Sequence, residues 1–165
     1  MSIIREIQTS RVLILGCGNV LLGDDGFGPA VIEQITSGSR LPPDVHAEDV
    51  GTSVREVLFD VALSERRPAH LILVDTMHKE GKKHGEVFEV NVRDLPEKKI
   101  TDYSMHQLPT SNLLKEIADL CGVRVTIIAA QLSDPAAALT MELSEAMTKA
   151  VLTAAKMACD LCVGE

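Results

Sequence analysis

Short apolar runs alternate with longer amphipathic segments along this chain. The apolar runs predict β-strands at Val12–Cys17, Val45–Asp49, Leu71–Asp75, Glu86–Asn91 and Arg124–Ala130. The amphipathic segments predict helices at Gly26–Ile35, Ser53–Leu63, Ser111–Leu120 and Ser144–Cys162. Strands that alternate with helices in this way favour an α/β domain built on a mainly parallel sheet.

One predicted strand differs from the others. Glu86–Asn91 alternates polar and apolar residues, whereas the other strands are nearly continuous apolar runs. Alternation indicates burial on one face only, so we expect an edge position and an antiparallel pairing. The polar stretches His78–Gly85 and Pro96–Tyr103 predict exposed loops rather than linkers, and residues 1–165 are therefore expected to form a single domain.

Composition narrows the class of protein. The chain has 165 residues, 45% of them hydrophobic, with three Phe, one Tyr and no Trp, which predicts a globular fold with an aliphatic core. A net charge of -8 disfavours a nucleic-acid partner. No apolar run approaches the roughly 18 residues of a membrane span, and the first residues lack the pattern of a signal peptide. The four cysteines form no small secreted framework, so we expect a reducing cytoplasm and no membrane partner.

The first strand ends in a glycine turn, Gly16-Cys17-Gly18, and two carboxylates, Asp24 and Asp25, follow before the next helix. Such a turn lies at the carboxyl edge of the sheet, where ligands bind in open α/β folds. A dinucleotide-binding fingerprint would need a third glycine where Leu21 stands, and the two carboxylates would repel a pyrophosphate. The glycines are therefore more simply explained by a tight turn, and nucleotide binding is the weaker alternative.

Four polar residues could carry chemistry at this edge, although each also has a structural explanation. Asp24 or Asp25 could cap the following helix, Asp75 could form a turn at its strand end, and His106 could be a solvated loop residue. Together, two carboxylates and an imidazole form a ligand set that zinc, nickel or non-haem iron accepts, with coordination positions left open. The spacing alone leaves both interpretations open.

Other reactive side chains have simpler explanations. Cys159 and Cys162 lie one helical turn apart, and without a second pair they predict packed helix cysteines rather than a metal or redox site. His78 and His84 fall in a polar loop and are expected to be solvated.

Several motifs, in this order, resemble those of the nickel–iron hydrogenase maturation endopeptidases. The matching segments are Gly16-Cys-Gly-Asn-Val-Leu21, Asp24-Asp25-Gly26, Asp49-Val-Gly-Thr52, Leu73-Val-Asp75, Met105-His-Gln-Leu108 and Leu132–Met147. The third segment has Val50 where the family pattern has a glycine. The resemblance covers nearly the whole chain, and the ordered set is far more specific than any one motif.

The resemblance implies a three-layer α/β/α sandwich with a twisted, five-stranded, mainly parallel sheet and one antiparallel edge strand. It also implies a peptidase that removes the C-terminal extension of a hydrogenase large-subunit precursor after nickel insertion. An F420-reducing hydrogenase is one candidate substrate. By the same resemblance, Asp25, Asp75 and His106 are the metal-contacting positions, and Asp49 is a further acidic position linked to activity.

The resemblance leaves the chemistry of cleavage open between a metal that polarises the scissile carbonyl and a carboxylate base. Asp24, Asp25 and Asp49 are the candidate catalytic carboxylates. Nickel is expected to arrive with the substrate, and zinc or another divalent metal could replace it in the isolated protein. A non-catalytic nickel-binding chaperone that inspects the precursor would need the same ligands and is the main alternative. We expect a monomer.

Overall fold

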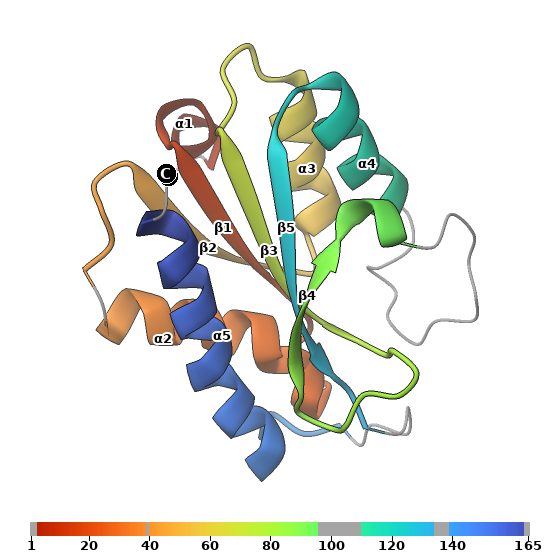
Figure 1. The fold of residues 1–165 in the computed structure, drawn as a ribbon. Helices are drawn as coiled ribbons and strands as arrows, with labels where there is room; N and C mark the ends of the chain where they lie inside the picture. Colours follow the sequence, from red (N-terminus) through yellow and green to blue (C-terminus); the bar gives the residue numbers. More distant parts are fainter. Residues whose placement is uncertain (1–2, 39, 96–109, 134–138, 164–165) are drawn as a thin grey trace.

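A computed structural model describes residues 3–38, 40–95, 110–133 and 139–163. Its strands form one five-stranded sheet in the order β2-β1-β3-β5-β4 (Figure 1). Their bounds are β1 Val12–Cys17, β2 Val45–Gly51, β3 His70–Met77, β4 Val87–Asn91 and β5 Arg124–Gln131. β1 pairs in parallel with β2 and β3, β3 pairs in parallel with β5, and β4 runs antiparallel to β5 at the edge. The predicted mainly parallel sheet with one antiparallel edge strand is confirmed.

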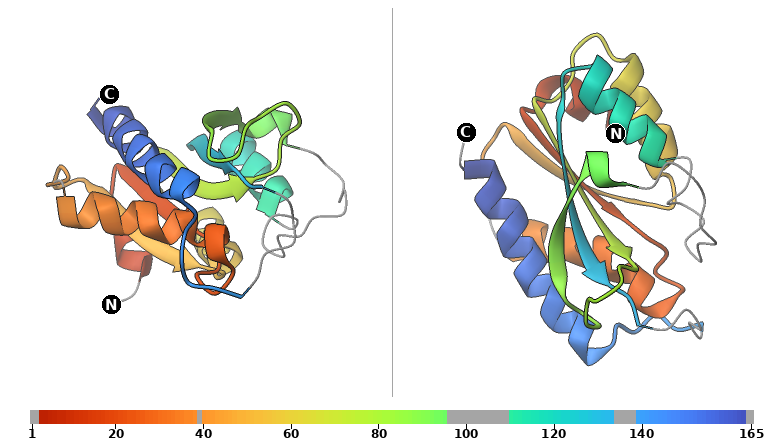
Figure 2. Two further views of the ribbon diagram at one scale, coloured as in Figure 1. Left: turned by 90° about the horizontal axis from the view of Figure 1, so that it is seen from below. Right: turned by 45° about the vertical axis from the view of Figure 1, so that its right-hand side comes forward.

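Helices cover both faces of the sheet (Figure 2). They are α1 Ile3–Thr9, α2 Phe27–Gly38, α3 Val54–Leu63, α4 Thr110–Leu120 and α5 Glu145–Val163, with the short 3₁₀ helices η1 Gly23–Gly26 and η2 Val92–Asp94. Successive residues of β1 enter opposite cores because side chains alternate along a strand. Leu13 and Leu15 pack with α1, α3 and α4, whereas Val12 and Ile14 pack with α2 and α5. These two cores confirm the three-layer α/β/α sandwich.

The observed elements differ from the predicted ones mainly at their ends. β2 continues two residues past Asp49 to Gly51, and α5 extends to Val163. Helix α1 was not predicted, because it has only seven residues and its apolar face consists of Ile3 and Ile7 with the half-exposed Ile4. Within the described ranges, no helix has the length and apolar character needed to cross a bilayer.

Close packing of α2 against the end of β1 places the following turn at the sheet edge. A methyl group at Gly28 would lie 2.1 Å from the carbonyl oxygen of Cys17, so only glycine allows this approach. Gly18 has a φ of 142°, and a methyl group there would lie 1.9 Å from the carbonyl oxygen of Asp25. These two glycines let the chain fold back so that η1 and its carboxylates stand beside the carboxyl ends of β1 and β3.

Candidate active site

Asp25 is buried at the carboxyl edge of the sheet, and its carboxylate joins the glycine turn to β3. The backbone N–H of Asn19 donates a 2.9 Å hydrogen bond to Asp25 Oδ2. The hydroxyl of Thr76 donates a 2.9 Å hydrogen bond to Asp25 Oδ1. Both hydrogen bonds fix the orientation of the carboxylate.

Asp75 ends the apolar part of β3 and lies next to Thr76 in the sequence. Its Oδ1 accepts a 2.7 Å hydrogen bond from the backbone N–H of Thr76. Asp75 is 9% exposed. Thr76 therefore contacts both carboxylates, one through its hydroxyl and the other through its backbone. Because Thr76 itself is fully buried, this link has little freedom to move.

Three carboxylates lie near the buried thiol of Cys17 at the carboxyl edge of the sheet. Cys17 ends β1 and is fully buried. Burial raises the pKa of its thiol well above the usual value, and the negative charges of Asp75, Asp49 and Asp25 raise it further. Asp49 lies opposite Gly16 in the parallel β1–β2 ladder, is itself exposed, and accepts a 2.9 Å hydrogen bond from the N–H of Gly51. The carboxyl ends of β1, β2 and β3, together with η1, thus bring these groups to one edge of the sheet.

The described donors fit part of a divalent-metal site. Asp25 and Asp75 supply buried carboxylate oxygens whose charges act on one thiol, and a cation beside them would offset that negative charge. No group of three His, Cys, Asp or Glu residues suited to a metal occurs among the residues that the structure describes. The predicted third ligand, His106, lies outside the described residues, so the complete Asp25–Asp75–His106 set stays a prediction.

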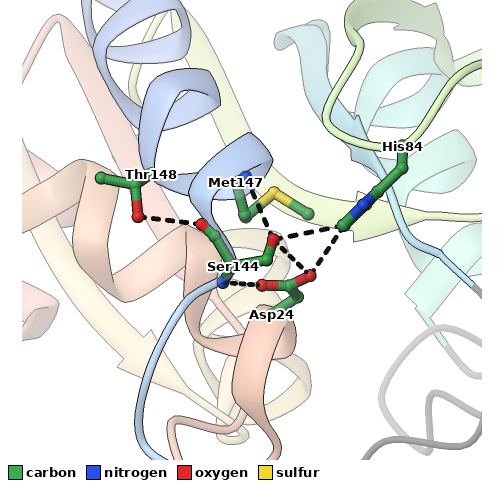
Figure 3. A network of polar contacts seen from close by, with 5 residues as sticks. All are labelled: Asp24, His84, Ser144, Met147 and Thr148. Carbon is green, nitrogen blue, oxygen red and sulfur yellow. Dashed lines mark hydrogen bonds and ion pairs between the residues drawn. The ribbon is translucent and has the colours of Figure 1, made fainter.

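Asp24 contacts the start of α5 (Figure 3). Its Oδ1 accepts a 2.7 Å hydrogen bond from the N–H of Ser144, and its Oδ2 accepts one of 2.9 Å from the hydroxyl of Ser144. His84 Nε2 lies 2.8 Å from Asp24 Oδ2. Ser144 Oγ in turn accepts a hydrogen bond from the N–H of Met147, which is the usual contact of an N-cap. Asp24 therefore connects η1, the β3–β4 loop and α5.

Asp24, His84 and Ser144 have the residue types of a serine-hydrolase triad but not its geometry. In a triad the aspartate binds one ring nitrogen and the serine binds the other. Here the same Nε2 contacts Asp24 and lies 3.3 Å from Ser144 Oγ. The serine hydroxyl also donates directly to Asp24 and caps α5. We therefore assign this cluster a structural role.

The two loop histidines correct an expectation from the sequence. His84 contacts Asp24, and His78 Nδ1 lies 3.1 Å from the side-chain nitrogen of Gln131, so neither is simply solvated. The partners lie 60 and 53 residues away, which local sequence pattern does not reveal.

Two further features surround the site. Gly51, with a φ of 52°, makes the turn after β2, and no non-glycine residue in the described ranges has a positive φ. Val50 therefore fits this turn without strain. An open groove of about 1020 Å³ also extends from His84 and Ser144 between the β3–β4 loop and α5, and Lys83 and Lys149 contribute to its walls.

Comparison with known proteins agrees with this fold. A family model described as hydrogenase maturation protease matches residues 29–161. A Methanocaldococcus jannaschii protein provisionally named as a hydrogenase maturation protease is 30% identical over 88% of this chain and 94% of its own length. The coenzyme F420 hydrogenase subunit delta of Methanothermobacter thermautotrophicus is 31% identical over 70% of this chain and 72% of its own.

A solved structure gives the same result. The hydrogenase maturating endopeptidase HybD from Escherichia coli superposes with a TM-score of 0.75 at 25% identity, covering 92% of this chain and 91% of HybD. The chain belongs to the hydrogenase maturation protease family.

Proposed function

We propose that this protein is a cytoplasmic endopeptidase that removes the C-terminal extension of a nickel–iron hydrogenase large-subunit precursor once nickel has been inserted. The observation that carries the proposal is the pair of buried carboxylates, Asp25 and Asp75, held together by Thr76 at the carboxyl edge of the sheet. Membership of the hydrogenase maturation protease family supports the type of reaction and the type of substrate. The similarity to the F420 hydrogenase subunit delta supports an F420-reducing hydrogenase as one candidate source of the precursor.

In this proposal the precursor carries the nickel ion as part of the substrate, and the protein recognises that ion. Asp25, Asp75 and His106 would hold the ion that the precursor carries, with oxygen and nitrogen donors that suit a divalent metal. An ion held there would polarise the carbonyl of the bond to be cut. Since three protein ligands leave positions for groups from the precursor, zinc or another divalent metal could bind the isolated protein in the same place.

The protein's own carboxylates can move the proton of the attacking water. Asp49 is exposed to solvent at the same edge of the sheet and is a suitable general base, with Asp25 as the second candidate. Asp24 was also predicted as a base, but its contacts with Ser144 and His84 favour a structural role. The groove beside α5 leaves space for a peptide that extends beyond the reacting bond.

Mass spectrometry of a mixture of the protein and nickel-loaded precursor tests the proposal. Release of one C-terminal peptide and a shortened large subunit would support an endopeptidase. A stable complex with the precursor still intact would contradict it and favour the nickel-binding chaperone instead.

A further inference from the structure

Strand β4 leaves one of its two edges open. It is the last strand of the sheet and pairs with β5 alone (Figure 1). The N–H of Gln131 donates a 2.9 Å hydrogen bond to the carbonyl of Glu86, and from there every second residue of β4 bonds to β5 in the antiparallel register. The N–H and C=O groups of Val87 and Glu89, which lie between those residues, therefore point away from β5. Among the residues that the structure describes, no hydrogen bond reaches these outward groups.

The open edge begins in the groove beside α5. Glu86 and Val87 form part of one wall of this groove, and Ala146, Lys149 and Thr153 of α5 form part of the other. Its volume of about 1020 Å³ lies at the upper end of the range for small-molecule sites. The groove is therefore large enough for a peptide segment that lies along β4.

The same groove extends to the candidate active site. His84 and Ser144 line it, and both contact the carboxylate of Asp24 (Figure 3). Asp25 follows Asp24 in η1. Because β4 is antiparallel to β5, it starts at the carboxyl edge of the sheet and runs away from that edge. A substrate chain that is cut at this edge and continues along the groove toward its C-terminus runs in the same direction as β4.

The chemistry of the open edge favours an extended polypeptide as its ligand. Unpaired N–H and C=O groups spaced along a strand match the main chain of an added strand, which is a common mode of peptide recognition. Charge is less selective here, since Lys149 lies 3.3 Å from Glu145 and Lys82 lies 3.5 Å from Glu86.

A second copy of this chain fits the open edge poorly. Glu89 is the central residue of β4 and is exposed. Complete antiparallel overlap of two β4 strands would place Glu89 directly opposite the same residue of the other copy. Like charges in that position are destabilising, and such charges protect edge strands from pairing with themselves.

We propose that the C-terminal extension of the hydrogenase precursor binds in this groove as an added strand, parallel to β4. The inference rests on the proposed function and adds how the segment to be removed is held. The main chain of the extension would bond to the outward groups of Val87 and Glu89, so the scissile bond would lie at the carboxyl edge near Asp25. Recognition through the main chain tolerates variation in the sequence of the extension.

Replacement of Glu89 by proline tests the pairing. Proline removes the outward N–H, whereas the hydrogen bonds of β4 to β5 do not use that group. Glu89→Ala is the matched control, because it removes the carboxylate and keeps the N–H. In steady-state cleavage of nickel-loaded precursor, kcat/KM should fall about tenfold for Glu89→Pro and stay within about twofold of wild type for Glu89→Ala.

A second measurement uses the wild-type protein alone. A synthetic peptide with the sequence of the C-terminal extension should inhibit cleavage at millimolar concentration, because it occupies the same groove. In a series of such peptides, each N-methylated at one residue, the loss of inhibition should alternate along the sequence, because alternate N–H groups of an added strand face β4. Absence of inhibition by the unmodified peptide, or inhibition without this alternation, would overturn the inference.

The kinetic outcomes separate the inference from the proposed function. Failure of the wild type to cleave nickel-loaded precursor would overturn the proposed function, and the inference would fall with it. Normal cleavage by the wild type with an unchanged kcat/KM in folded Glu89→Pro would overturn the inference alone. A wild-type dimer in sedimentation that Glu89→Pro converts to a monomer would show that β4 pairs two copies of the chain, against this proposal.

Discussion

The hydroxyl of Thr76 donates a 2.9 Å hydrogen bond to Asp25, although the two residues lie 51 positions apart. The backbone N–H of the same threonine binds Asp75 at 2.7 Å. One fully buried residue of β3 therefore contacts both carboxylates of the candidate metal site. This contact explains how a strand end and a 3₁₀ turn can act as one unit.

Replacing Thr76 with valine should separate these carboxylates while keeping the shape of the side chain. Loss of a buried hydrogen bond to a charged group costs about 1.5–3 kcal/mol of unfolding free energy. We expect precursor processing to fall by about tenfold or more, because Asp25 loses its orientation. Thr76→Ser retains the hydroxyl and should restore most of the activity. A folded Thr76→Val variant with wild-type kcat and KM would show that the link is unimportant for catalysis.

Asp24→Ala should act mainly on stability. The change removes the acceptor for two Ser144 donors at the start of α5, so we expect a loss of about 1–3 kcal/mol in chemical denaturation. Asp160→Ala, which breaks the exposed ion pair with Lys156, is the control and should cost less than about 0.5 kcal/mol. Processing assayed well below the melting temperature should stay within about threefold of wild type. Complete loss of processing by folded Asp24→Ala would return Asp24 to the candidate bases.

The Cys17 thiol should resist alkylation in the folded protein. Only the thiolate reacts, and burial together with three nearby carboxylates raises the thiol pKa, so the thiolate fraction at a given pH falls. With iodoacetamide at about pH 8, peptide mapping should find Cys121, which is partly exposed, labelled well before Cys17. Raising the pH should speed Cys17 labelling only at strongly alkaline values. Equal labelling of both residues in the folded state would argue against the buried, negatively charged edge.

His106→Ala should abolish precursor processing and leave the fold largely intact, because the resemblance assigns this histidine a donor role rather than a packing role. His46→Ala is a suitable control, since His46 lies near the start of β2 and contacts Glu48 and Glu6. Circular dichroism should give similar spectra for both variants and wild type. Wild-type processing by His106→Ala would remove this residue from the metal set.

The sequence predicted the layers and the sheet because these depend on local hydrophobic pattern. Two patterns are typical of buried strands: the β-branched run at Arg124–Ala130 and the continuous apolar run at Leu71–Asp75. The carboxyl ends of parallel strands meet at one edge of the sheet, which is why Asp75 could be placed at the same edge as the glycine turn, whereas Asp49 was suggested only by the family resemblance. The edge strand was recognisable because one face of it is polar.

Contacts between distant segments could not be predicted in the same way. The Asp24–Ser144 link joins residues 120 positions apart, and no spacing in the sequence signals it. Thr76 follows Asp75 and resembles an ordinary strand residue, so its bond to Asp25 depends on the path of η1. Helix α1 was not predicted because Ile3 and Ile7 give it an apolar face of only two turns.

Under the proposed function, Asp25, Asp75 and His106 together recognise the nickel that the precursor carries. The decisive measurement is the cleavage of nickel-loaded and metal-free precursor at matched concentrations and in excess protein, with a chelator added to the metal-free sample. Mass spectrometry should find the C-terminal peptide released from the nickel-loaded precursor, whereas the metal-free precursor should stay intact. The reason is that three protein ligands alone leave the metal site incomplete. Equal cleavage of both samples would contradict the account and would transfer the catalytic role to carboxylates that act without the ion, such as Asp49.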